Sequence, residues 1–161
     1  MEETRAAKPD ETQTLVAQTI AIHAERRGAL LPVLHDIQAA IGYVPDAAVP
    51  AIAAGLNITR AEVHGVITFY HDFRSAPPPA HVVKLCRAEA CQARGGRRIE
   101  VAAEERLGVA MGKARRDGQA ALEPVYCLGL CAVGPSALVD GRPVGRLDEA
   151  GIDAIAREIG L

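Results

Sequence analysis

Two short stretches decide how this chain folds and what it can bind: Cys86-Arg-Ala-Glu-Ala-Cys91 and Cys127-Leu-Gly-Leu-Cys131. All four cysteines of the 161-residue chain lie in these stretches, one a C-x4-C pair and the other a C-x3-C pair. Thiolates are ligands of soft metals and iron–sulfur clusters, and four thiolates are the usual complement of a 2Fe-2S cluster. We therefore predict that Cys86, Cys91, Cys127 and Cys131 converge on one 2Fe-2S cluster.

The spacing of the cysteines alone leaves two other chemistries open. Pair spacings of two to four residues also suit a structural zinc ion, and the chain would then be a zinc-stabilised interaction module. Two disulfides would suit an exported protein. However, the start of the chain, residues 1–14, is polar and acidic and lacks the apolar core of a secretion signal. We therefore expect a cytoplasmic protein whose thiols stay reduced.

Composition argues against two classes of partner. The chain has 18 basic and 20 acidic side chains, so its net charge of −2 favours neither a nucleic acid nor an anionic membrane. A helix-turn-helix resemblance at residues 57–64 would allow a DNA-binding regulator, but the N-terminal half is acidic. The uncharged run at residues 124–139 is shorter than the ~20 residues that a membrane-spanning helix needs. We expect no nucleic acid partner and no membrane insertion.

The first half of the chain has a helical pattern, because its apolar residues recur every three or four positions. Four short helices with small connections predict a helical bundle. The fourth begins with a capping box, Thr59-x-x-Glu62, in which each side chain can bond the backbone N–H of the other. The first three are expected at residues 14–27, ended by Gly28, at residues 30–41, ended by Gly42, and at residues 46–55.

Three consecutive prolines at residues 77–79 predict a domain boundary, because they cannot continue a helix. We expect a helical docking domain at residues 1–79 and a cluster domain at residues 80–161. The second domain shows β-strand patterns and two helical ones, in the order β-α-β-β-β-α, which predicts an α+β fold. Its strands are expected at residues 81–85, 119–126, 136–139 and 142–145, and its helices at 99–107 and after Asp148.

Several motifs along the chain resemble one family, the small 2Fe-2S subunit of NADH:quinone oxidoreductase and its relatives. They are Leu31-Pro-x-Leu34, Gln38-x3-Gly42-Tyr-Val-Pro45, Gly65-Val-Ile-Thr-Phe-Tyr70, C-x4-C-x3-Gly95 and Cys127-Leu-Gly-x-Cys131. The resemblance implies an N-terminal helical bundle followed by a thioredoxin-like 2Fe-2S ferredoxin domain. It also implies that Cys86, Cys91, Cys127 and Cys131 are the cluster ligands.

The segments Cys86–Gln92 and Cys127–Gly141 are most similar to the γ subunit of soluble, molybdenum-containing NAD-dependent formate dehydrogenases. Respiratory members tend to carry a Thr-Thr pair before the Asp-Gly turn, where this chain has Lys113-Ala-Arg-Arg116. The resemblance implies a non-catalytic electron-transfer subunit that docks on a flavin- and NAD-binding subunit. FMN and NAD would then be bound by that partner, and molybdenum by a large catalytic subunit. The equivalent subunit of an NAD-reducing hydrogenase or a respiratory NADH dehydrogenase is the alternative.

Overall fold

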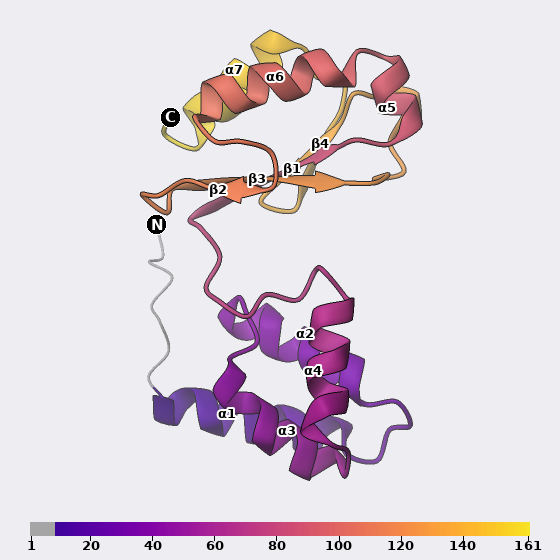
Figure 1. The fold of residues 1–161 in the computed structure, drawn as a ribbon, viewed down its shortest axis with the longest axis vertical. Coiled ribbons are helices and arrows are strands. Elements are labelled where there is room, and N and C mark those ends of the chain that lie inside the picture. The colour runs from indigo at the N-terminus through magenta and orange to yellow at the C-terminus, as the bar shows by residue number, and fades with distance from the viewer. Residues whose placement is uncertain (1–8) are drawn as a thin grey trace. The chain divides into compact units, whose positions relative to one another are not determined.

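The computed structural model describes residues 9–161. Residues 1–8, with most of the polar start considered above, lie outside the described residues. The chain divides into two compact units, Met1–Pro78 and Pro79–Leu161, so that the division falls within the proline run (Figure 1). The assignment of the first unit to docking and of the second to a cluster stays a prediction.

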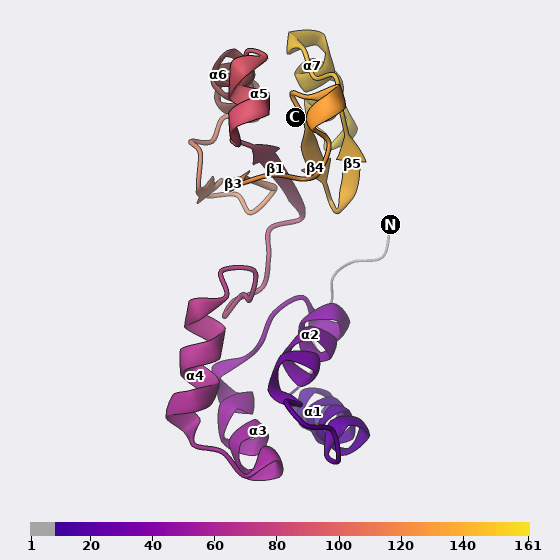
Figure 2. The same cartoon turned by 90° about the vertical axis from the view of Figure 1, so that its right-hand side faces the viewer.

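The N-terminal unit is a bundle of helices around an aliphatic core (Figure 2). Its buried residues come from every helix of the unit, and aliphatic side chains provide nearly all of them. The core is made by Val16, Val33, Leu34, Ile37, Val44, Ala48, Val49, Ile52, Ala53, Val63, Ile67 and Phe73. Its elements are α1 (Pro9–His23), α2 (Leu30–Ile41), the 3-10 helix η1 (Asp46–Ala48), α3 (Val49–Leu56) and α4 (Arg60–Phe69).

Helix α1 differs at both ends from the expected residues 14–27. It begins at Pro9 and ends at His23, and turns at residues 24–29 connect it to α2. The helix expected at residues 46–55 is a 3-10 turn followed by α3. Pro50 lies in the first turn of α3, where its missing N–H has no intrahelical partner to lose.

Helix α4 begins with the predicted capping box. The Glu62 backbone N–H donates to Thr59 Oγ1 at 3.1 Å, and the Thr59 backbone N–H donates to Glu62 Oε2 at 2.7 Å. The pKa of Glu62 is lowered, because its carboxylate accepts hydrogen bonds from Thr59. The bond from the Thr59 backbone N–H contributes most, and the bond from the Thr59 hydroxyl contributes less. Two of the helix's unpaired N-terminal donors are thereby satisfied.

The C-terminal unit confirms the α+β class. It contains a five-stranded sheet in the order β2-β3-β1-β4-β5, in which β1 and β3 are parallel and the other neighbours antiparallel. Helix α5 and strand β2 were not predicted. The elements are β1 (His81–Cys86), α5 (Glu89–Ala93), α6 (Gly96–Leu107), β2 (Lys113–Ala114), β3 (Ala120–Val125), the 3-10 helix η2 (Cys131–Val133), β4 (Ala137–Val139), β5 (Arg142–Val144) and α7 (Glu149–Glu158).

Helices α6 and α7 lie side by side on one face of this sheet (Figures 1 and 2). Alternate residues of the strands face them, as the pleat of a strand requires. The shared core contains Val83, Leu85, Ile99, Ala103, Leu107, Val109, Ala120, Leu122, Ala137, Val139, Leu147, Ile152, Ile155, Ala156 and Ile159. Asp148 caps α7 as predicted, since its Oδ1 accepts the backbone N–H of Gly151 at 2.8 Å.

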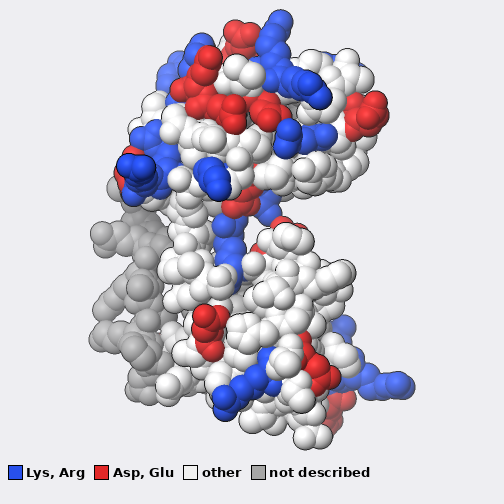
Figure 3. Space-filling model, viewed as in Figure 1, with Lys and Arg blue, Asp and Glu red and all other residues white. Residues whose placement is uncertain are grey.

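Acidic and basic side chains are intermixed on the face of the C-terminal unit shown in Figure 3. Arg106 Nε lies 2.7 Å from Asp153 Oδ1, joining α6 to α7, and Arg98 pairs with Glu149 at 3.3 Å. Pairs this exposed contribute little to stability, because solvent and salt screen the charges. Within residues 9–161, no helix combines the length and the apolar character needed to span a bilayer.

The capping box generates a first prediction. The Thr59→Ala variant should lose about 1 kcal/mol of stability in the N-terminal unit, because the Glu62 N–H loses its acceptor. Urea unfolding followed by circular dichroism measures this loss. Thr68→Ala is the matched control, since the exposed Thr68 hydroxyl bonds back only to the carbonyls of His64 and Gly65 within the same helix. An equal loss in both variants would contradict the capping assignment.

Candidate metal centre

The two predicted cysteine motifs meet at one edge of the sheet. Cys86 is the last residue of β1, and it pairs in register with Val125, the last residue of the parallel strand β3. Cys127 follows Val125 by two positions. Because parallel strands end at the same edge of a sheet, this register brings Cys86 and Cys127 close together.

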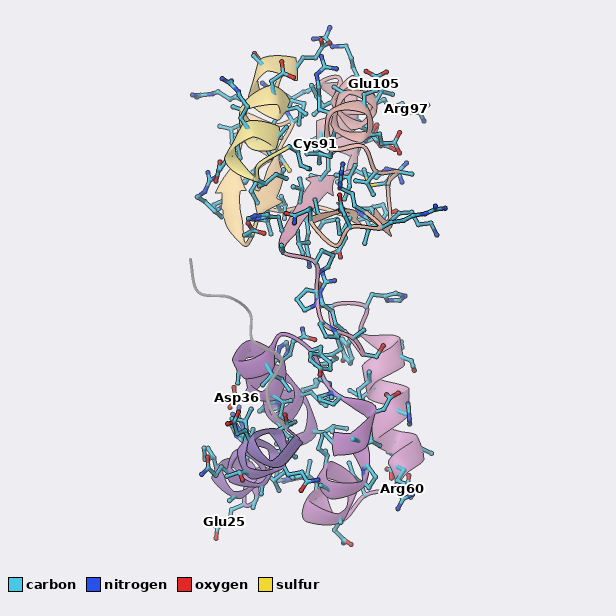
Figure 4. The ribbon with its side chains drawn as sticks, turned by 90° about the vertical axis from the view of Figure 1, so that its left-hand side faces the viewer. Glu25, Asp36, Arg60, Cys91, Arg97 and Glu105 are labelled. Atoms are coloured by element: carbon cyan, nitrogen blue, oxygen red, sulfur yellow. The ribbon has the colours of Figure 1, made fainter. Side chains whose placement is uncertain are left out.

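The other two cysteines lie in short helices beside that edge. Cys91 is in α5, and Cys131 begins η2. Figure 4 shows Cys91 inside the C-terminal unit, while Arg97 and Glu105 lie on the α6 side. Cys86 and Cys91, here the inner pair, are 3% and 2% exposed, whereas Cys127 and Cys131, the outer pair, are exposed. The structure therefore brings together all four predicted residues as one buried and one exposed pair.

The sulfur atoms of the outer pair are 3.8 Å apart. Two thiolates bound to one tetrahedral metal at about 2.3 Å are separated by about 3.8 Å, so this distance fits a shared metal ion. All four cysteines are free thiols in the structure. Across residues 9–161, no three His, Cys, Asp or Glu side chains are grouped so as to hold a single ion.

Backbone N–H groups surround the Cys86 thiol. Burial by itself would raise the pKa of Cys86, but hydrogen bonds outweigh it and the pKa is lowered. The backbone N–H of Ala88 gives the largest of these contributions, followed by the Cys91 thiol and the N–H groups of Cys127 and Leu128. Donors from both cysteine motifs thus point at one sulfur, which stabilises its thiolate form.

The Cys91 thiol has a different environment. Burial is the largest cause of its raised pKa, and the neighbouring Cys86 thiol raises it further. Ser136 opposes this shift, because its Oγ lies 3.6 Å from Cys91 Sγ and its backbone also contributes a hydrogen bond. Ser136 is itself 1% exposed, so its hydroxyl is a buried polar group placed against the inner pair.

The outer pair is carried by a loop with left-handed backbone. Cys127 has a φ of +88°, a region that costs a residue with a side chain about 1–2 kcal/mol. Gly129, at a φ of +74°, donates its N–H to Cys127 Sγ at 3.4 Å. The Cys127 thiol is the main cause of the raised pKa of Cys131, and the charges of Cys91 and Cys86 act in the same direction. The inner and outer pairs are therefore within electrostatic reach of each other.

Close backbone approach holds the inner pair in place. A Cβ at Gly96 would lie 2.7 Å from the Cys91 carbonyl oxygen, so the start of α6 can pack against α5 only with glycine there. A Cβ at Gly134 would lie 3.1 Å from Cys91 Sγ. Gly96 and Ser136 were not identified from the sequence, because their role depends on which segments meet.

One charged neighbour has a defined partner. Arg87 follows Cys86, and its Nε lies 2.9 Å from Glu100 Oε2 on α6. The Glu100 side chain is 17% exposed, against 38% for Arg87. The Glu100 carboxylate therefore holds the Arg87 guanidinium toward α6, beside Cys86, and compensates its positive charge.

The donor set fits a 2Fe-2S cluster. Such a cluster takes four thiolates, two on each iron, and its negative charge is stabilised by hydrogen bonds to sulfur. The site provides two pairs of thiols together with N–H groups directed at them. The backbone approaches Cys91 so closely at Gly96 and Gly134 that larger side chains have no room there.

Fold and site together define an α+β protein with four cysteines gathered at the end of a mixed sheet. Residues 16–160 match the family described as thioredoxin-like 2Fe-2S ferredoxin. The chain belongs to this family, which confirms the resemblance drawn from its motifs and the thioredoxin-like ferredoxin fold. At the level of the family, it also supports the 2Fe-2S cofactor.

Similar proteins are components of oxidoreductases. The E subunit of NADH-quinone oxidoreductase from Escherichia coli (strain K12) is 36% identical over 118 residues, covering 73% of this chain and 71% of that protein. The HndA subunit of the NADP-reducing hydrogenase from Solidesulfovibrio fructosivorans is 28% identical over 153 residues, covering 95% of this chain and 90% of that protein.

A solved structure shares the fold over most of the chain. It is an NAD+-reducing NiFe hydrogenase in the H2-reduced state, with a TM-score of 0.71 and 25% sequence identity over 81% of this chain. This chain covers only 22% of that hydrogenase chain.

The packing at Gly96 generates a second prediction. The Gly96→Ala variant should destabilise the C-terminal unit by about 1–3 kcal/mol, because the new Cβ must displace the backbone of Cys91. Thermal unfolding measures this, and alkylation of Cys91 in the cluster-free chain should become faster. Gly65→Ala, also in a helix but with no atom within 4 Å of the added Cβ, should be neutral or stabilising. Unchanged stability in Gly96→Ala would refute the close approach.

Proposed function

We propose that Cys86, Cys91, Cys127 and Cys131 hold one 2Fe-2S cluster and that the chain is an electron-transfer subunit without catalytic residues of its own. The observation that supports this most is the meeting of two thiol pairs at the end of β1 and β3. When bound, a 2Fe-2S cluster accepts and releases one electron at a time.

The residues of this chain would serve that chemistry in two ways. The inner pair and the outer pair would each provide two thiolates to one iron. Added negative charge is costly in a buried site, because a low dielectric does not screen it. The N–H groups of Ala88, Cys127 and Leu128, which point at Cys86, would offset part of that cost.

The partner in this proposal is a flavin- and NAD-binding subunit, which would carry FMN and NAD. A flavin can divide a two-electron hydride transfer into single electrons, and this chain would exchange them. The names of the similar proteins, one from an NADH-quinone oxidoreductase and one from an NADP-reducing hydrogenase, support a complex of this kind. A cytoplasmic location agrees with four free thiols.

For the parent complex we propose a molybdenum-containing, NAD-dependent formate dehydrogenase. Support comes from the sequence around Cys86–Gln92 and Cys127–Gly141, which resembles its γ subunit. Formate oxidation would then take place on a large molybdenum and iron–sulfur subunit. An NAD-reducing hydrogenase or a respiratory NADH dehydrogenase is the second candidate, favoured by the similarity to the NADH-quinone oxidoreductase protein and to HndA.

Metal analysis tests the cluster. Anaerobically purified chain should be red-brown and contain about two irons and two acid-labile sulfides per chain, as a 2Fe-2S cluster requires. Cys91→Ser and Cys127→Ser should each lose most of the iron, because each removes a thiolate from a different pair.

The Thr59→Ala variant is the control for this experiment, since its substitution lies in the N-terminal unit and should leave the iron content unchanged. Stoichiometric zinc in colourless protein, without iron or sulfide, would refute the electron-transfer proposal and favour the zinc-stabilised interaction module.

Purification from native cells tests the complex. An affinity-tagged chain should co-purify with a flavin-binding subunit and a molybdenum subunit, and the preparation should reduce NAD+ with formate.

Phe69 on α4 is 72% exposed and stacks edge-on against Tyr70, so an aromatic surface is free for docking. Phe69→Ser should therefore reduce recovery of the flavin subunit, whereas Ile22→Ser, at a 76% exposed residue on α1, should not. Hydrogen-dependent NAD+ reduction without formate activity would refute the formate assignment.

A further inference from the structure

The two cysteine pairs differ in their access to solvent. The inner pair is almost completely buried, and the Cys86 thiol is enclosed by backbone donors while Cys91 faces buried Ser136. The outer pair is exposed, with its two sulfur atoms 3.8 Å apart. Any reagent that approaches the cluster-free chain from solvent therefore meets Cys127 and Cys131 first.

We propose that Cys127 and Cys131 form a reversible disulfide in the cluster-free chain, by exchange with a low-molecular-weight disulfide such as oxidised glutathione. The thiolate of one outer cysteine attacks the external disulfide, forms a mixed disulfide and releases one thiol. The second outer cysteine then displaces the other thiol. Two protein thiols are oxidised, one external disulfide is reduced to two thiols, and no further oxidant is needed.

The loop that carries the outer pair can close this bond. The sulfur atoms must approach from 3.8 Å to about 2.05 Å, a change within reach of side-chain rotation. The three residues between the cysteines include Gly129, whose φ of +74° is already in the left-handed region that a tight loop uses. Because the second outer thiol is already a neighbour, we expect it to attack the mixed disulfide faster than an external thiol does.

The inner pair should not react in this way. Its two thiols are also neighbours, since each affects the pKa of the other. However, exchange requires an in-line approach of the external disulfide to sulfur, and exposed fractions of 3% and 2% leave no path for it. Selectivity between the pairs follows from burial, not from spacing.

The functional consequence rests on the proposed cluster. A disulfide at the outer pair removes two of four ligands and would prevent cluster insertion until a reductant restores the thiols. It would also protect the most exposed sulfur atoms from irreversible oxidation to sulfinic and sulfonic acids. The outer pair would thus be a redox-controlled entry point for cluster loading.

Peptide mapping tests the disulfide directly. The full-length chain, freed of metal by chelation and fully reduced, is incubated anaerobically with oxidised glutathione. The exchange is then quenched with acid, the chain is unfolded in urea, and its free thiols are blocked with N-ethylmaleimide. Trypsin places Cys86 in peptide 85–87, Cys91 in peptide 88–94, and both outer cysteines in peptide 117–146. The expected product is an internal disulfide in peptide 117–146, with peptides 85–87 and 88–94 alkylated. It should form at least about tenfold faster than any change at the inner pair.

Variants identify the order of events. Cys131→Ser should trap Cys127 as a mixed disulfide with glutathione, whereas Cys91→Ser, the matched control, should still form the Cys127–Cys131 bond. Oxidation of all four cysteines at similar rates, a link between peptides 85–87 and 88–94, or an outer pair that stays fully alkylated would overturn the proposal. Circular dichroism in the same buffer shows whether the chain is folded. In about 8 M urea, which unfolds most domains, the preference of oxidised glutathione for the outer pair should disappear.

A final step separates this inference from the proposed function. Oxidised chain should take up no iron and sulfide until dithiothreitol is added, while reduced chain should take them up at once. If the disulfide forms but reduced chain never binds iron, the inference stands and the cluster proposal fails. If oxidised chain binds a full complement of iron, the disulfide has no role in cluster loading.

Discussion

The parallel pairing of β1 with β3 is the constraint on which the rest of the site depends. Its register ends both strands at the same edge, with Cys86 opposite Val125 and Cys127 two residues beyond. Hydrogen bonds continue past the strands, since the Cys86 N–H donates to Ser136 and the Arg87 N–H to Val125. A shift of this register by one residue would move Cys86 to the other face of the sheet.

The site built on this edge is asymmetric in its access to solvent. Its inner half is buried, and peptide dipoles directed at Cys86 can stabilise negative charge without moving. Its outer half is exposed on a loop in which even Cys127 adopts a positive φ. In the proposed cluster site, burial would protect bound iron and sulfur, while the exposed edge would shorten the path to a partner. The same exposure leaves two thiols open to solvent before any metal is bound.

Local signals predicted most elements, and the exceptions have physical reasons. The capping box at Thr59 and the Asp148 cap of α7 were read from sequence because each depends on residues three apart. Helix α5 was missed because its five residues are too few to show a helical period. Strand β2 was missed because its two exposed residues have no pattern of their own, and it exists only through pairing with β3.

By itself, the sequence determined the family, the α+β class and the four cysteines of the candidate centre. Residue type and the spacing of residues within a motif are local properties of the chain, so they can be recognised without the fold. Only the tertiary structure decided which cysteines are buried, which backbone N–H groups face Cys86, and why Gly96 and Ser136 matter. These properties depend on contacts between residues far apart in sequence. Local spacing carries no information about them, since burial and hydrogen bonding arise when β1, β3 and the loop before β4 come together.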